Sequence, residues 1–277
     1  MRGVVGTGDG DLRGTPRGDN WSSGDLYEPY VGRWSRLVGA EFLRWLAASA
    51  AGRWLDVGCG TGALAQTILS SASPLEVVGV DPSPGHVAYV EQHTADVRAR
   101  FEIGDAQALN FPDQSFDYVV SGLVLNFIPD PTRGLREMRR VVRPDGTVAV
   151  YVWDYPGEMQ LMRYFWDAAV ELDPPAADLH EGRRFSFCQP DGLAALLSEA
   201  GFTQPQVREI VVPTRFEDFD DYWTPFLGGQ APAPSYLASL DDEGRAALRD
   251  SVRSRLPTGD DGSISLTARA WAIRSRR

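Results

Sequence analysis

The sequence predicts an α/β fold built on a doubly wound, parallel sheet, and two observations carry that prediction. Short apolar runs alternate along the chain with apolar residues at helical spacing, which is typical of strands joined by crossover helices. The clearest unit is an apolar run over 53–57, a glycine-rich turn, and a helical pattern over 64–72. A strand, a glycine turn and a helix in that order form a crevice at the carboxyl edge of a parallel sheet.

The glycine turn reads Gly58-x-Gly60-x-Gly62. It lacks the G-x-G-x-x-G spacing of a dinucleotide site, which argues against an NAD-dependent oxidoreductase. It is not a phosphate-binding P-loop either, because the required lysine is missing and the chain contains no lysine at all. Glycines accept positive φ and let a ligand approach the backbone amides and the helix N-terminus.

A second strand over 76–80 ends in Asp81. An acid at the end of the second strand, about twenty residues beyond the glycines, suits the hydroxyls of a ribose. A carboxylate can accept hydrogen bonds from two hydroxyls at once. The alternative is a turn acid or helix N-cap ahead of Pro82-Ser83-Pro84.

Three motifs together carry a family resemblance: the octet over 55–62, Gly79-Val80-Asp81, and Gly104-Asp105-Ala106. They resemble the class I S-adenosylmethionine-dependent methyltransferases, most closely the small-molecule branch called type 11, over about residues 50–155. The resemblance implies S-adenosyl-L-methionine as the cofactor. It also implies a Rossmann-like, doubly wound, seven-stranded sheet whose final strand runs antiparallel between the fifth and sixth.

The resemblance also assigns roles. The glycine loop lies against the methionine part of the cofactor, Asp81 holds both ribose hydroxyls, Asp105 bonds the adenine amino group, and Ala106 offers a backbone amide. The predicted cofactor-binding residues are Asp56, Gly58, Cys59, Gly60, Thr61, Gly62, Asp81, Pro82, Asp105, Ala106, Leu123 and Arg33. Leu123 is included because residues 121–126 should form the crevice edge opposite the glycine loop, where Asn126 is also expected to face the site.

The segment ahead of the first strand divides in two. Residues 1–20 are rich in glycine and charge and predict a disordered tail. Residues 21–50 carry aromatic and apolar side chains at helical spacing, and in related methyltransferases such a segment folds over the cofactor as a lid. Arg33 could pair bidentately with the carboxylate of the cofactor, or instead form a surface ion pair on a packing helix.

The remaining chain is expected to complete a single domain over 21–277. We predict a cofactor-binding half over 51–155, a substrate-pocket insertion over 156–190 and a C-terminal half over 191–277. Helices are expected at 84–97, 135–142, 159–169, 193–200 and, as one helix, 237–256; strands at 99–104, 116–120, 147–153, 206–216 and 263–273; a turn at 144–146; and a loop or extended piece at 181–187.

The insertion commonly builds the acceptor pocket in the family that this chain resembles. Its apolar stripe includes Met159, Met162, Phe165 and Trp166, which suggests an apolar or aromatic small-molecule acceptor. The same spacing equally describes a core-facing helix, and both interpretations hold if the helix has two buried faces. A cluster of arginines over 133–143 has the spacing of a solvated helix face.

The composition excludes several classes of binding partner, location and cofactor. The net charge is −11 at pH 7, which opposes nucleic-acid and anionic-membrane partners. No run approaches the length of a membrane span, and the first twenty residues lack a secretory apolar region, so we expect a cytoplasmic protein. Cys59 and Cys188 do not suggest a disulfide framework, and the histidines show no metal spacing, so no metal is expected. Whether the protein is a monomer or a homodimer stays open.

Transfer of a methyl group needs a base only if the acceptor must lose a proton first. The candidates are His180, Asp154, Tyr155 and Glu181, and none has a motif that assigns it the role. The sequence therefore also allows a second hypothesis, a cofactor-binding protein without methyl transfer, such as a cyclase or a regulatory protein.

Overall fold

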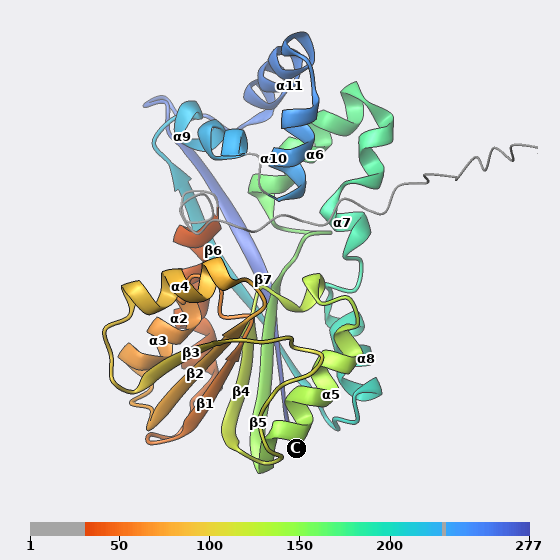
Figure 1. The fold of residues 1–277 in the computed structure, drawn as a ribbon. Helices are drawn as coiled ribbons and strands as arrows, with labels where there is room; N and C mark the ends of the chain where they lie inside the picture. The colour runs from red at the N-terminus through yellow and green to blue at the C-terminus, as the bar shows by residue number, and fades with distance from the viewer. Residues whose placement is uncertain (1–30, 229–230) are drawn as a thin grey trace, which may run out of the picture.

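A computed structural model describes residues 31–228 and 231–277 (Figure 1). Seven strands form one sheet in the order β3-β2-β1-β4-β5-β7-β6. The strands are β1 (Arg53–Val57), β2 (Glu76–Asp81), β3 (Ala99–Ile103), β4 (Phe116–Gly122), β5 (Val142–Trp153), β6 (Gln206–Phe216) and β7 (Ile264–Arg276). The first five are parallel, and β7 lies antiparallel between β5 and β6. The predicted fold is confirmed.

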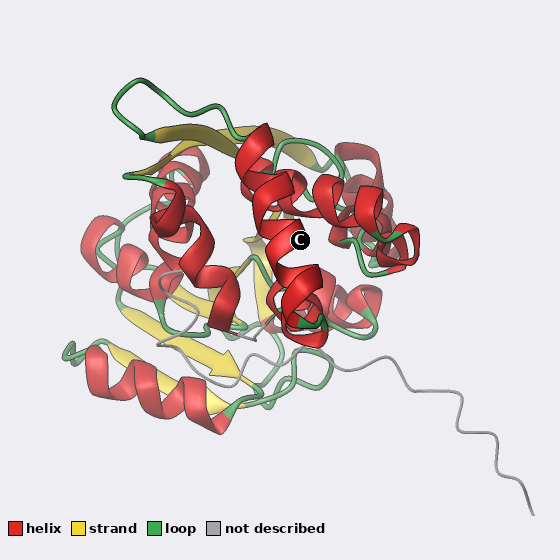
Figure 2. Ribbon diagram, turned by 90° about the horizontal axis from the view of Figure 1, so that it is seen from above, coloured by secondary structure: helices red, strands yellow, loops and turns green. Residues whose placement is uncertain are grey.

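Helices cover both faces of the sheet, and a further group lies beyond one end (Figures 1 and 2). The helices are α2 (Arg33–Leu46), α3 (Ala63–Ser71), α4 (Pro84–His93), α5 (Pro131–Val141), α6 (Gln160–Leu172), α7 (Glu181–Arg184), α8 (Pro190–Glu199), α9 (Phe219–Trp223), α10 (Pro232–Ser239) and α11 (Asp242–Arg255). In Figure 1, α2, α3 and α4 lie on one side of the sheet and α5 and α8 on the other. The group formed by α6, α9, α10 and α11 lies above it, where β6 and β7 extend.

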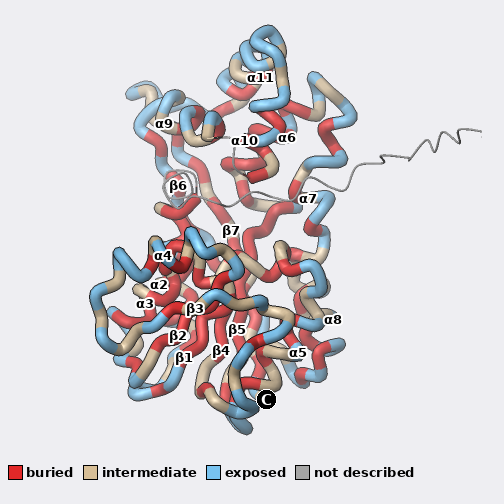
Figure 3. Tube along the Cα trace, in the orientation of Figure 1, coloured by how far each residue is buried: buried red, intermediate tan, exposed pale blue. Residues whose placement is uncertain are grey.

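The centre of the sheet is the most deeply buried part of the molecule (Figure 3). Residues 54–57 of β1 are buried on both faces, as expected for a central parallel strand covered by helices. Trp54 is fully buried and stacks on Tyr118 of β4 with ring centroids 4.3 Å apart. This rigid centre fixes the point where β1 passes into the glycine loop.

Several predicted boundaries were wrong. Helix α4 ends at His93 rather than 97, and Asp96 turns the chain by accepting a hydrogen bond from the Arg98 backbone N–H at 2.9 Å. Strand β5 begins at Val142 and includes the predicted turn at 144–146, because Val142 pairs with Phe116 before an irregularity in the ladder.

Two further errors concern helices. The piece at 181–187 begins with the one-turn helix α7, which the His180 side chain caps by accepting from the Gly182 backbone N–H at 2.9 Å. The single helix predicted over 237–256 is two, α10 and α11. Asp241 is the N-cap of α11, accepting from the Gly244 backbone N–H at 2.8 Å, so a new helix starts where the apolar spacing continues without a break.

The tail over 1–20 and the first ten residues of the predicted lid lie outside the described residues. The described part of that segment is α2, whose Val38 and Phe42 are fully buried. Over 31–228 and 231–277, no helix combines the length and apolarity needed to cross a membrane.

Candidate active site

A cavity of about 520 Å³ lies at the carboxyl edge of the parallel strands. Its walls come from the residues that follow β1, β2, β3 and β4 and from the end of β5, which is where an open α/β sheet places a ligand. Ten of the predicted cofactor-binding residues line it: Asp56, Gly58, Cys59, Gly60, Thr61, Asp81, Pro82, Asp105, Ala106 and Leu123. The structure therefore gathers most of the predicted site around one space.

Two of the three loop glycines, Gly58 and Gly60, line the cavity, and the third, Gly62, is used for packing. All three glycines have positive φ, at 76°, 51° and 89° for Gly58, Gly60 and Gly62. A Cβ on Gly60 would meet nothing within 4 Å, whereas a Cβ on Gly62 would lie 2.4 Å from Cγ2 of Val90. Gly62 is the N-cap of α3 and is absent from the cavity wall. The loop therefore leaves open space for a ligand beside Gly60 and packs tightly against α4 at Gly62.

This difference predicts distinct effects of two alanine substitutions. Gly60→Ala should cost about 1 kcal/mol of unfolding free energy from its positive φ, yet lower cofactor affinity by at least about tenfold, because its methyl group enters the cavity. Gly62→Ala should cost about 2 to 4 kcal/mol, because strain and the Val90 clash add. Urea unfolding and isothermal titration with S-adenosylmethionine measure both. Wild-type affinity in Gly60→Ala would show that the ligand does not lie against this loop.

Asp81 is at the rim of the loop and is only 6% exposed. Its Oδ2 accepts a hydrogen bond from the Gly60 backbone N–H at 3.0 Å, and its Oδ1 accepts from the Ser83 backbone N–H at 2.9 Å. The Nδ1 of His86 lies 3.2 Å from Oδ1. The N-cap of α4 is Ser83, so Asp81 shapes the turn without capping the helix, and its carboxylate lines the cavity.

Asp56 is a buried acid without a hydrogen-bond partner. It is 1% exposed, and neither carboxylate oxygen has a partner within the described part of the chain. Burial raises the pKa of Asp56 from 3.8 to about 7; the Ala65 backbone N–H lowers it, and the nearby charge of Asp81 raises it further. An unpartnered acid beside the open glycine loop fits a ligand that carries a cationic amine, as S-adenosylmethionine does.

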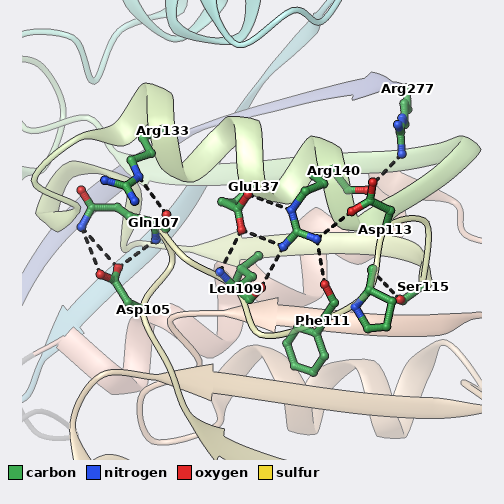
Figure 4. Close-up of polar contacts among 11 residues, drawn as sticks. Asp105, Gln107, Leu109, Phe111, Asp113, Ser115, Arg133, Glu137, Arg140 and Arg277 are labelled. Carbon is green, nitrogen blue, oxygen red and sulfur yellow. Dashed lines mark hydrogen bonds and ion pairs between the residues drawn. The ribbon is translucent and has the colours of Figure 1, made fainter.

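The loop that carries Asp105 and Ala106 is held from α5 (Figure 4). Glu137 accepts from the Leu109 backbone N–H at 3.0 Å, and Arg140 donates to the backbone oxygens of Leu109 and Phe111, both at 2.8 Å. Arg140 also pairs with Glu137 at 2.7 Å and lowers its pKa. The helical spacing of the arginines predicted a solvated face, but Arg140 instead holds the backbone of the segment that follows Asp105 and Ala106.

The base candidates lie in different surroundings. Tyr155 is 5% exposed and lines the cavity, with its ring 5.4 Å from that of Phe185. Asp154 is fully buried away from the cavity wall and pairs with Arg269 at 2.6 Å. His180 caps α7 and stacks on Trp166 at 5.7 Å, and burial lowers its pKa. The structure brings only Tyr155 of these three to the cavity.

Three other expected residues also lie outside the cavity wall. Arg33 pairs with Asp221 at 3.0 Å, and its guanidinium carbon lies 4.9 Å from the ring centroid of Phe216. Asn126 is buried, and its amide has no partner in the described residues. Glu181 is buried and hydrogen-bonded to the Trp166 indole.

Part of the cavity wall is formed by apolar and aromatic side chains, and the sequence analysis missed several of them. These side chains include Leu123, Phe127, Ile128, Tyr151, Trp153, Tyr155 and Met162. Met162 faces the cavity from α6, while Phe165 and Trp166 on the same helix are fully buried in the core. The apolar stripe of this helix therefore serves both purposes. Tyr151 belongs to a predicted strand and Phe127 directly follows the predicted crevice edge at 121–126, but no local signal distinguished either from a core residue.

The fold is that of a doubly wound α/β protein, and the cavity lies at the sheet edge where this class binds its ligands. A family model described as a methyltransferase domain matches residues 55–150. The 2-methyl-6-phytyl-1,4-hydroquinone methyltransferase of Synechocystis sp. is 34% identical over 172 residues, which cover 61% of this chain and 52% of that protein. The chain thus spans about half the length of this relative.

A demethylmenaquinone methyltransferase of Roseiflexus castenholzii is 33% identical over 172 residues, covering 58% of this chain and 72% of that protein. The solved structure of the YcgJ protein of Bacillus subtilis has the same fold, with a TM-score of 0.57, 22% identity and coverage of 86% of this chain and 97% of that one. The chain belongs to the class I S-adenosylmethionine-dependent methyltransferases, in the type 11 branch. S-adenosyl-L-methionine is the cofactor of this family.

Proposed function

We propose that this protein transfers a methyl group from S-adenosylmethionine to a small apolar or aromatic molecule. One observation carries the proposal: two acids, Asp81 and the unpartnered Asp56, share a cavity with the open glycine loop. In this proposal Asp81 accepts from the ribose hydroxyls and Asp56 faces the methionine ammonium group. Asp105 and Ala106 then contact the adenine, as the family resemblance implies.

The acceptor is proposed to bind against the apolar part of the cavity wall. Leu123, Phe127 and Trp153 offer an aromatic and aliphatic surface there, which suits a planar, uncharged ring. The relatives named above are a hydroquinone and a demethylmenaquinone methyltransferase, so their names also support a ring-bearing acceptor.

The cofactor supplies a methyl group already activated by the positive sulfur. The protein is left with the tasks of aligning the acceptor and excluding water, and the closely packed apolar wall suits both. Tyr155 is the one base candidate that lines the cavity, and we assign it the role of holding a polar atom of the acceptor. Asp154 and His180 have no such role in this proposal.

Isothermal titration with S-adenosylmethionine tests the cofactor site. Asp81→Ala should weaken binding by about a hundredfold, because two hydrogen bonds to a charged acceptor are lost. Asp242→Ala is the matched control, since the Asp242 side chain is 104% exposed and lies in the first turn of α11. Unchanged affinity in Asp81→Ala would overturn the assignment of the ribose site.

Incubation with a labelled methyl donor and a panel of phenols, hydroquinones and aromatic amines tests the transfer itself. Label in the acceptor supports the proposed activity. Saturable cofactor binding without label in any acceptor would favour the second hypothesis from the sequence, a cofactor-binding cyclase or regulatory protein.

A further inference from the structure

The two oxygens of Asp81 are unequally occupied. Oδ1 has two donors, the Ser83 backbone N–H at 2.9 Å and Nδ1 of His86 at 3.2 Å. Oδ2 has one, the Gly60 backbone N–H at 3.0 Å. A carboxylate offers about four acceptor positions, two on each oxygen. Among the described residues, Oδ1 is therefore fully used, while Oδ2 has one position left.

A ribose that donates one hydroxyl to each oxygen needs a position on Oδ1. One of its two donors must then move away. The Ser83 N–H is a poor candidate, because its backbone is held at the start of α4, where the Ser83 hydroxyl accepts from the His86 backbone N–H at 3.3 Å. His86 instead contacts Asp81 through a side chain with two rotatable bonds. That side chain lines the cavity and is 13% exposed.

We propose that His86 is a latch on Asp81 that a ribose diol displaces when the cofactor binds. This inference rests on the proposed function and adds a specificity residue that the sequence motifs do not contain. Asp81 can only accept, so the hydrogen lies on Nδ1 of His86 in the latched state. A ligand with both hydroxyls gains two bonds to Asp81 and breaks one, whereas a ligand without the diol leaves the latch closed.

The latch therefore lowers affinity for every ligand that carries the diol. Removing its donor should raise that affinity by about two- to tenfold, the range that corresponds to one net hydrogen bond. The gain should be absent for a ligand that makes no bond to Asp81. A role in which His86 simply holds Asp81 in place predicts the opposite sign, a loss of affinity.

Two variants separate the donor from the bulk of the side chain. His86→Leu fills similar space but cannot donate, and His86→Asn places an amide N–H near the position of Nδ1. Affinities of S-adenosylhomocysteine, adenosine and 2′,3′-dideoxyadenosine are measured by titration calorimetry or by competition. We expect His86→Leu to bind the two diol ligands more tightly, His86→Asn to stay near wild type, and dideoxyadenosine affinity to be the same in all three proteins.

Weaker or unchanged binding of the diol ligands by His86→Leu overturns the latch, as does an equal gain for dideoxyadenosine. The Asp81→Ala variant distinguishes this failure from failure of the proposed function. If S-adenosylhomocysteine binds the wild type and Asp81→Ala abolishes that binding, the ribose site stands and only the latch is wrong. If Asp81→Ala has no effect, both are wrong.

Discussion

Asp56→Asn is expected to stabilise the ligand-free protein at pH 8 by about 4 kcal/mol while weakening cofactor binding. Folding raises the pKa of this carboxyl from 3.8 to about 7, mainly through burial. A shift of about three units corresponds to about 4 kcal/mol. The folded state keeps a proton that the unfolded state releases, so the stability from this group is complete below pH 4 and is lost as the pH rises through 7. The amide resembles the neutral acid and avoids that loss.

Urea unfolding between pH 5 and 8 measures this effect. The difference in unfolding free energy between Asp56→Asn and wild type should grow as the pH rises and level off above 7. A difference that is constant across this range would show that the carboxyl titrates alike in the folded and unfolded states.

The same carboxyl should make cofactor affinity depend on pH. A bound cation favours the ionised acid, so wild-type affinity for S-adenosylmethionine should fall by up to about tenfold per pH unit below 7. Asp56→Asn should bind more weakly than wild type at pH 8, with a flatter profile. A steep profile retained in the amide variant would assign the pH dependence to another group.

Asp154→Ala is expected to destabilise the protein by about 3 to 5 kcal/mol without a direct effect on chemistry. Asp154 is fully buried, pairs with Arg269 at 2.6 Å and accepts from the Gly157 and Glu158 backbone N–H groups at 3.0 and 2.9 Å. Gln189 also donates to it. Arg269 keeps its pair with Glu209 at 2.9 Å, but removing the carboxylate takes away its buried partner and the side-chain acceptor of two part-buried N–H groups at the junction between β5 and α6.

Denaturant unfolding gives the stability, and methyl transfer per folded molecule gives the activity. Asp154→Asn is the matched control, because it keeps an acceptor oxygen and should lose less stability than Asp154→Ala. Loss of transfer in either variant with unchanged stability would return Asp154 to the role of a base.

Local sequence was enough to predict the strands and helices around the glycine loop, while the seven-stranded sheet with its antiparallel last strand was implied by the family resemblance. Strand and helix periods are set by neighbouring residues, and glycine at positive φ follows from backbone sterics, so β1, the turn and α3 were predicted within a residue or two. Where a capping residue interrupts a continuing apolar pattern, as at Asp241, periodicity failed because it does not register one hydrogen bond.

The pairing of distant side chains was decided only by the tertiary structure. Arg33 meets Asp221, 188 positions along the chain, and Arg140 holds the backbone at Leu109. Tyr155 and Asp154 are adjacent in sequence, yet only Tyr155 lines the cavity, because consecutive residues leaving a strand point in different directions. The sequence by itself determined the fold class and the residues near the cavity. Which of them face it depends on partners brought together by folding, and no local pattern records those partners.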